Sequence, residues 1–256
     1  MREVYIVCID WKDKTINPKN LLDLMSALPL DVQDKLKKFY HAEDSWRSLL
    51  GHLLPRHWLT QQAVPLGQLK FGKTEYGKPI IASSPTPLSY NVTHDSDMVA
   101  IACEAGNPIG IDVMRVALPR NTKMHEFVEF VSDQLSAREK QILRSSSGDE
   151  PSRLLWLYRM WTVKEAYTKA LGEGVGYDFA RIEYDVLSQT VKVDGHVPRG
   201  WDIVSFLVPY QADIYVVSVA CQTGGDEWCM SHLDSPPEGL VNFVDVETLA
   251  KEFTSC

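Results

Sequence analysis

Hydrophobic and polar positions follow several different patterns along the chain, and the first 115 residues combine strand and helix patterns. Runs rich in apolar and β-branched residues predict four strands, at residues 3–9, 88–92, 98–103 and 109–113. Between the first two of these strands, apolar residues recur at spacings of three and four from residue 31 to 62. This spacing predicts a helix that Gly51 or Pro55 kinks or divides. Residues 64–88 are rich in proline and glycine, which predicts loops.

Helical patterns return after Pro119. Residues 123–143 predict a helix that is broken near residues 132–136. Residues 152–171 predict the clearest helix of the chain. Ser152 is a suitable N-cap for it, and Gly172 is suited to the position just after its end.

Four strand patterns follow that helix, with the sequences RIEYDV, TVKVDG, WDIVSFLV and IYVVSVAC. Residues 223–238 are rich in glycine, proline and serine and predict a linker. The segment VNFVDVETLAKEF then predicts a short strand and a helix. Because the order of elements is similar in the two parts, we expect an α+β fold of two similar halves, residues 1–115 and 116–256.

The charge balance narrows the range of partners. The chain has 34 acidic and 26 basic residues, a net charge of −8, whereas nucleic-acid-binding proteins are generally basic. No apolar run approaches the ~18 residues of a membrane span, and the run near residue 1 is too short for a secretion signal. The five cysteines are widely spaced, without a CxxC pair. These features predict a reduced, cytoplasmic protein that binds neither nucleic acid nor membrane.

The motifs GxGxxG, HExxH and GxSxG are absent. Asp112 stands inside the apolar run IGIDV, where an acid is costly unless it is paired or binds a metal. Glu165 and Lys169 lie on a strongly aromatic helix with little free surface, so we expect them, with Lys164, to border a cleft. The ordinary alternatives are an acid that hydrogen-bonds a turn and a surface ion pair.

Other polar residues stand at strand ends, turns and helix surfaces. His94 ends a strand pattern, Lys73 and Lys78 flank a turn, and Arg47 lies in a basic stretch of the first helix. Each of these is ordinarily structural or solvated. Together with the carboxylates, however, they fit one chemistry. Mg²⁺ binds one or two carboxylates and substrate phosphates, while cations neutralise the remaining phosphate charge, as phosphoryl transfer requires.

Two motifs make the chain resemble a known family. Gly110-Ile111-Asp112 and the later block WTVKEAYTK together resemble the signature of the 4′-phosphopantetheinyl transferases. Upstream motifs of the family are matched in the same order by His41–Gly51, Gly77-Lys78-Pro79 and Asn91-Val92-Thr93-His94. The length of the chain points to the pseudo-dimeric, Sfp-type subgroup, which includes the aminoadipate-semialdehyde dehydrogenase phosphopantetheinyl transferases. The resemblance implies an active site at the interface between two similar halves.

The resemblance also implies a reaction. A serine hydroxyl of an apo acyl or peptidyl carrier protein attacks the β-phosphorus of coenzyme A. The 4′-phosphopantetheine arm moves to the serine, and adenosine 3′,5′-bisphosphate leaves. Carriers of fatty acid, polyketide, nonribosomal peptide and aminoadipate (lysine) metabolism are all candidate substrates. Because one chain already contains both halves, we expect a monomer.

Each matching residue takes a role from this resemblance. Asp112 and Glu165 would hold Mg²⁺, with Mn²⁺ as an alternative, against the pyrophosphate. Lys164 and Lys169 would stabilise charge on the reacting phosphate. Either Glu165 or Glu139, which lies in the segment SAREK, would be the general base. Coenzyme A would be held further by Arg47, Ser48, Lys73, Lys78, Pro79, Thr93 and His94.

The chain departs from the family pattern at Met114. Many members carry a second acid at this position, two residues after the Asp, and a thioether is a poor ligand for a hard cation. Water would then replace the missing carboxylate, or metal binding would be weaker. Two other functions are kept as alternatives. One is a different Mg²⁺-dependent phosphotransferase acting on a nucleotide, and the other is a non-catalytic module that binds carrier proteins or coenzyme A.

Overall fold

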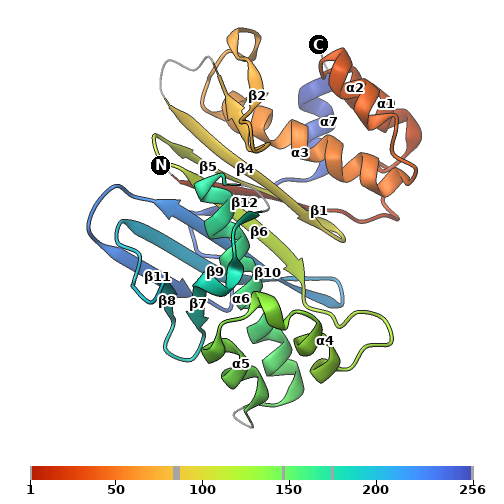
Figure 1. Cartoon of the computed structure of the whole chain (residues 1–256). Coiled ribbons are helices and arrows are strands. Elements are labelled where there is room, and N and C mark those ends of the chain that lie inside the picture. The colour runs from red at the N-terminus through yellow and green to blue at the C-terminus, as the bar shows by residue number, and fades with distance from the viewer. Residues whose placement is uncertain (1, 83–86, 146–147, 174–175, 255–256) are drawn as a thin grey trace.

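The computed structural model describes residues 2–82, 87–145, 148–173 and 176–254. Two four-stranded sheets lie at its centre, and helices cover the outer side of each sheet (Figure 1). Apolar side chains of both sheets form one buried cluster between them, which includes Ile6, Ala100, Ile111 and Val217. Each sheet forms one further buried cluster with the helices that cover it. The mixture of helices and sheets agrees with the expected α+β class.

The first sheet has the strand order β12-β1-β5-β4. Its strands are β1 (Glu3–Cys8), β4 (Leu88–Asp95), β5 (Met98–Ala105) and β12 (Val241–Phe243). β5 is antiparallel to β1 and β4, whereas β12 is parallel to β1. The helices on this sheet are α1 (Pro18–Ser26), α2 (Leu30–Leu36), α3 (Ala42–Gln61) and α7 (Val246–Thr254). After α3 come a 3-10 turn, η1 (Leu66–Gln68), and a hairpin of β2 (Phe71–Lys73) and β3 (Pro79–Ile81).

The helix predicted at residues 31–62 is in fact two helices, α2 and α3, separated at residues 37–41. Neither Gly51 nor Pro55 divides α3. Pro55 is buried inside the helix and removes only one backbone hydrogen bond, which the packed surroundings tolerate. Gly51 instead lets α3 approach β4, because a Cβ there would lie 3.1 Å from Val92 Cγ1.

The second sheet has the strand order β11-β9-β10-β6. Its strands are β6 (Ile109–Arg115), β9 (Trp201–Tyr210), β10 (Asp213–Gln222) and β11 (Trp228–His232). β10 is antiparallel to β6 and β9, and β11 is parallel to β9. The helices on this side are α4 (Met124–Phe130), α5 (Ala137–Arg144) and α6 (Glu150–Leu171). Two 3-10 turns, η2 (Ser132–Gln134) and η4 (Phe179–Arg181), and a hairpin of β7 (Ile182–Asp185) and β8 (Thr190–Val193) complete it.

The bounds of the helices after Pro119 are close to the predicted bounds. The break expected near residues 132–136 lies between α4 and α5. Helix α6 begins at Glu150, two residues earlier than predicted, because Asp149 rather than Ser152 is its N-cap. The Asp149 side chain accepts a hydrogen bond from Ser152 N at 3.0 Å. Gly172 ends α6 in the left-handed conformation, with φ of 76°, as predicted.

Strands occupy two stretches that the sequence predicted as irregular. The β2–β3 hairpin lies within residues 64–88, and β11 lies within the predicted linker at 223–238. Trp228 and Met230 of β11 pack against the cluster beneath α6. Pairing with β9 and this packing outweigh the turn-forming residues on either side of β11.

Two segments cross the expected boundary between residues 115 and 116. β6 precedes the boundary but belongs to the second sheet. β12 and α7 follow it but belong to the first sheet, where Leu249 of α7 is fully buried. Figure 1 shows this return, with α7 in blue among the red and orange helices. The two halves are therefore interleaved at their ends.

No helix in the described part of the chain combines the length and apolar character needed to cross a membrane. Among the same residues, the cysteines Cys8, Cys103, Cys221 and Cys229 are free thiols. Burial raises the pKa of Cys8 to about 11, so this thiol stays protonated at neutral pH. Cys256 lies outside the described residues.

Candidate active site

A row of polar side chains on β4 joins the two sheets. Asn91, Thr93 and Asp95, at alternate positions, each accept a hydrogen bond from a backbone amide of β6. The donors are Ile111, Val113 and Arg115, at 3.0, 3.3 and 2.6 Å. Because β6 is an edge strand of its sheet, these side chains satisfy amides that no neighbouring strand bonds. The motif that ends β4 thus fixes one sheet against the other.

Gly110 lets helix α6 lie directly on β6. A Cβ at this position would fall 2.1 Å from Ala166 O and 2.4 Å from Ala170 N, far too close for any side chain. Glycine is therefore required for this contact. The close packing brings two residues of α6, Glu165 and Lys169, beside the acid that follows on β6.

That acid, Asp112, is buried and only partly satisfied. Its Oδ1 accepts from Lys169 Nζ at 2.6 Å and from Thr93 Oγ1 at 3.1 Å. Its Oδ2 is buried and has no hydrogen-bond partner. Burial raises the pKa of Asp112, and the ion pair with Lys169 opposes that shift. A buried oxygen without a partner costs free energy, so Oδ2 marks a position suited to a cation or a water.

Glu165 is partly exposed in the wall of a cleft of about 470 Å³. Burial and the neighbouring Asp112 both raise the pKa of Glu165, because two carboxylates in one poorly solvated site repel each other. Oxygen donors of this kind suit Mg²⁺ or Mn²⁺. Within the residues that the structure describes, no group of three or more His, Cys, Asp or Glu side chains gathers as a complete metal site. Substrate oxygens or water would have to supply the other ligands.

The cleft has two walls, which come from separate parts of the chain. One wall comes from the β2–β3 turn and β4, and the other from α6 and the segments around it. The first wall consists of Tyr76, Gly77, Lys78, Pro79, Asn91 and Val92, and the second of Gln134, Trp161, Glu165, Thr168, Lys169, Gly172, Tyr177 and Phe179. Among the residues predicted from the sequence, Lys78, Pro79, Glu165 and Lys169 line it directly. Asp112 and Thr93 contact Lys169.

Lys78 bridges the two walls. Its ammonium donates to Ala170 O at 2.6 Å, in the last turn of α6, where carbonyl groups lack partners within the helix. Burial lowers the pKa of Lys78 to about 8. Gly172 leaves room for this side chain, because a Cβ there would lie 3.0 Å from Lys78 Cδ. Lys78 therefore caps α6 from the opposite wall of the cleft.

Arg47 and His94 lie near the far end of β4 and do not line the cleft itself. Arg47 Nη1 donates to Ser96 O at 2.8 Å, and its Nη2 pairs with Asp44. Partial burial and the nearby cations Arg47 and Lys169 lower the pKa of His94. The acids Asp95 and Asp44 act on His94 in the opposite direction, so cations and carboxylates are mixed around it.

Three further positions flank the site. Ser48 is partly buried on α3, and Met114 is partly buried on β6. Lys73 is exposed at the end of β2 and lines a neighbouring groove of about 870 Å³. None of the three lines the cleft that contains Glu165.

Lys164 and Glu139 were predicted as catalytic residues, but the structure buries both away from the cleft. Their side chains are 1% and 0% exposed, and they form an ion pair at 2.6 Å. Burial raises the pKa of Glu139 and lowers that of Lys164, and the ion pair opposes both shifts. Other protein groups also bond to both side chains. Neither side chain reaches a phosphate oxygen or a serine proton unless this core opens.

Several residues of the site were given no role from the sequence, and Asn91 was named only as part of a motif. Asn91 had a readable signal, because polar residues alternate with apolar ones along β4. Gln134, Tyr177 and Phe179 reach the cleft from connections before and after α6. Nothing local in the sequence marks these three, since their position depends on how the connections fold back.

Comparison with known proteins identifies the family. Residues 11–106 match the profile described as 4′-phosphopantetheinyl transferase, N-terminal, and residues 108–212 match that of the 4′-phosphopantetheinyl transferase superfamily. The two profiles meet just ahead of β6.

Individual relatives agree with these profiles. A 4′-phosphopantetheinyl transferase of Paxillus involutus is 40% identical over 239 residues, which are 87% of this chain and 89% of the relative. The L-aminoadipate-semialdehyde dehydrogenase-phosphopantetheinyl transferase of Mus musculus is 30% identical over 65% of this chain. That match covers 55% of the mouse protein, so this chain spans about half of its length. A 4′-phosphopantetheinyl transferase of Bacillus subtilis is 29% identical over 74% of this chain and 80% of its own. The chain therefore belongs to the 4′-phosphopantetheinyl transferase superfamily.

Proposed function

We propose that this chain transfers the 4′-phosphopantetheine arm of coenzyme A to a serine hydroxyl of apo acyl or peptidyl carrier proteins. Adenosine 3′,5′-bisphosphate is the leaving group. The observation that carries the proposal is the Asp112 carboxylate, buried with one oxygen unpartnered, beside Glu165 and Lys169 at a cleft. Two acids and a lysine in this arrangement suit a metal-bound pyrophosphate. The names of the similar proteins point to the same reaction.

Asp112 and Glu165 are the residues that would hold Mg²⁺ or Mn²⁺. The unpartnered Oδ2 of Asp112 and the mutual repulsion of the two acids both fit a divalent cation. When bound, the metal would supply positive charge against the pyrophosphate oxygens. Met114 offers no oxygen ligand, so water would replace the missing carboxylate there, or the metal would bind more weakly.

Cations from both halves bind the rest of coenzyme A. Lys169, 29% exposed, stabilises charge on the bridging and leaving oxygens of the pyrophosphate. Arg47 and His94 bind the 3′-phosphate, for which the planar guanidinium offers two donors at once. The nucleotide is further held by Ser48, Lys73, Lys78, Pro79 and Thr93.

Glu165 is the better candidate for the general base. It is partly exposed in the cleft, where the serine hydroxyl of a carrier protein can arrive. Glu139 has no exposed surface, and both of its oxygens already accept hydrogen bonds. A base must come within hydrogen-bond reach of the proton that it removes, which favours Glu165.

The two halves act as a pseudo-dimer whose active site lies at their interface. The support for this is the pair of similar sheets, each covered by one long helix, and the cleft with walls from both halves. A monomer then contains a whole site. Monomeric state, cytoplasmic location and the identity of the carrier proteins stay predictions.

Mass spectrometry of an intact apo carrier protein tests the proposed function. The carrier is incubated with this chain, coenzyme A and Mg²⁺, with EDTA in a parallel reaction. We expect a mass gain of one phosphopantetheine arm that EDTA abolishes. If the folded chain binds coenzyme A but modifies no carrier of several types, the non-catalytic binding module is correct instead. Preference for ATP over coenzyme A would favour a different nucleotide phosphotransferase.

A further inference from the structure

Lys164 stands at the centre of a closed polar cluster behind the second wall of the cleft. Its ammonium donates to Glu139 Oε2 at 2.6 Å, to Gln134 O at 2.8 Å and to Phe179 O at 3.1 Å. These three bonds use all the donors of an ammonium group. The lysine therefore holds two backbone carbonyls that belong to separate connections, one before α5 and one before β7.

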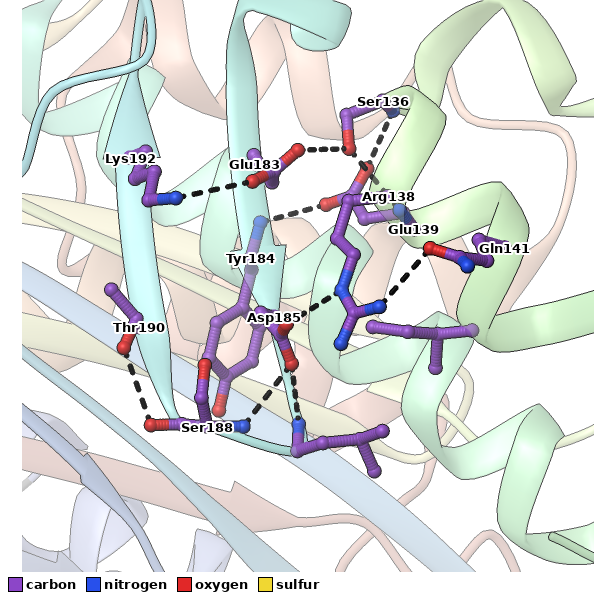
Figure 2. A network of polar contacts seen from close by, with 12 residues as sticks. Ser136, Arg138, Glu139, Gln141, Glu183, Tyr184, Asp185, Ser188, Thr190 and Lys192 are labelled. Carbon is purple, nitrogen blue, oxygen red and sulfur yellow. Dashed lines mark hydrogen bonds and ion pairs between the residues drawn. The ribbon is translucent and has the colours of Figure 1, made fainter. Parts of the chain in front are cut away.

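Glu139 completes the cluster from the opposite side. Its Oε1 accepts from Tyr184 N at 2.9 Å, and its Oε2 accepts from Ser136 N at 2.8 Å as well as from Lys164 (Figure 2 shows the backbone donors). Helices α5 and α6 and strand β7 are thus tied together at one buried point. A buried ion pair is a weak source of net stability, because both charges must leave water. A role in positioning gives this pair a reason beyond stability.

The residues whose carbonyls Lys164 holds belong to the cleft. Gln134 and Phe179 both line its second wall. The ring of Phe179 packs edge-on against Trp161, another lining residue, with 5.7 Å between the ring centroids. Glu165 lies one helical turn beyond Trp161 on α6. The buried pair therefore sets the backbone of the wall that flanks the candidate catalytic acid.

We propose that Lys164 and Glu139 are a positioning pair that holds this wall in place for the pantetheine arm of coenzyme A. This step rests on the proposed function. In the proposed function the nucleotide contacts residues of the first wall, Lys78 and Pro79, which leaves the second wall to the arm.

The composition of that wall suits such a ligand. The pantetheine arm is an aliphatic chain with two amide groups. Trp161 and Phe179 offer aromatic surface, and the Gln134 side chain offers an amide. A shift of this wall would then weaken binding of the arm without disturbing the nucleotide.

Two ligands separate positioning from a general loss of structure, because coenzyme A carries the arm and adenosine 3′,5′-bisphosphate lacks it. The double variant Lys164→Met/Glu139→Gln removes both buried charges together. We expect it to bind coenzyme A about tenfold more weakly and the bisphosphate less than about twofold more weakly. Isothermal titration calorimetry on the full chain with Mg²⁺ measures both affinities, and circular dichroism at the same temperature verifies the fold.

Arg138→Gln is the matched control. Arg138 pairs with Asp185 at 2.7 Å and so joins the same elements, α5 and β7, at a more exposed place that does not line the cleft (Figure 2). We expect both affinities to stay unchanged in this variant. An unchanged affinity for coenzyme A in the double variant, or an equal loss for the two ligands, would overturn the positioning role.

Hydrogen–deuterium exchange of the unaltered protein gives a second test. This test does not depend on whether a variant folds. Coenzyme A should slow exchange in the segments at Gln134–Ser136 and Phe179–Tyr184 more than the bisphosphate does. Equal protection by the two ligands would contradict the proposal. Failure of the proposed function is distinguishable, because the unaltered chain would then modify no carrier protein, whatever the binding constants are.

Discussion

Two lysines of helix α6 each form an ion pair with a carboxylate from another element. Lys164–Glu139 and Lys169–Asp112 each have 2.6 Å between nitrogen and oxygen. The first pair is sealed, with side chains 1% and 0% exposed, whereas Lys169 of the second is 29% exposed. Five positions along a helix turn the two lysines to different sides, one toward α5 and β7 and the other toward β4 and β6. Position alone gives the same two chemical groups different surroundings.

The pairs differ most in how completely each carboxylate is satisfied. Glu139 accepts three hydrogen bonds over its two oxygens, but Asp112 accepts two on one oxygen and none on the other. An acid with all its partners would have to break existing bonds to take a cation or a proton. A metal and phosphate site must therefore be left incomplete by the protein, at a cost in folding free energy.

The largest expected effect comes from removing the charge of the incomplete acid. Asp112→Asn should lower kcat/KM for transfer about a thousandfold and raise the Mg²⁺ concentration that gives half the maximal rate. Its melting temperature should change little, because the lysine that it leaves is partly exposed and can be hydrated. Mass spectrometry of the carrier protein measures the rate. A kcat/KM within tenfold of the unaltered chain would remove Asp112 from the metal site.

Removing the charge of the sealed acid should act mainly on stability. In Glu139→Gln, one carboxylate oxygen becomes an amide nitrogen that cannot accept, and Lys164 stays buried without a counter-charge. We expect the free energy of unfolding to fall by about 3 kcal/mol. Urea denaturation followed by circular dichroism measures it. A loss below about 1 kcal/mol would show that the two pairs are more alike than their burial indicates.

A smaller effect is expected from completing the ligand set. Met114→Glu adds an acid two residues after Asp112, on the same face of β6. If water occupies that side of the metal, Mg²⁺ should bind about tenfold more tightly. A Mg²⁺ titration of the transfer rate measures the change, with Met114→Gln as the control of similar size and no charge. Unchanged or weaker Mg²⁺ binding in the glutamate variant argues against this account.

The smallest expected effect is a pH dependence of stability near the Lys164–Glu139 pair. His232 Nδ1 lies 3.1 Å from the hydroxyl of Tyr184, and burial, with Arg159 nearby, lowers the pKa of His232 to about 4. The unfolded histidine has a pKa of about 6.5, so between pH 6.5 and 4 only the unfolded state takes up this proton. The free energy of unfolding should therefore fall as the pH falls through this window, by about 1 kcal/mol at pH 5.5.

Denaturation of His232→Gln across the same pH range checks this assignment. The variant lacks the titrating ring, so its stability should depend less on pH between 6.5 and 4 than that of the unaltered chain. If the pH dependence is the same in both proteins, another group is responsible for it.

Part of the site could be predicted from the sequence. An acid in an apolar strand and charged residues on an aromatic helix have few explanations, so Asp112, Glu165 and Lys169 entered one hypothesis before any fold was known. Lys164 could not be told apart from Lys169, because the difference depends on what packs against each side of α6. Glu139 supplies that difference, and its burial requires β7, more than forty positions later in the chain.

The elements of the fold also differ in how well the sequence predicted them. Long elements with strong periodicity, such as α6, were predicted with nearly correct bounds. The break at residues 37–41 and the strand β11 were not, because tertiary packing decides them rather than local preference. The pairing of β12 with β1 joins residues from the two ends of the described chain and has no local signal.

The return of β12 and α7 to the first sheet has a consequence for synthesis on the ribosome. The second sheet is built from one continuous stretch, residues 109–232, and can close as soon as that stretch is made. The first sheet keeps an unpaired edge at β1 until residues 241–254 follow. A nascent chain therefore carries an open strand edge for most of its translation, which is the kind of surface that pairs with other chains. A stop codon before residue 241 would leave that edge permanently open.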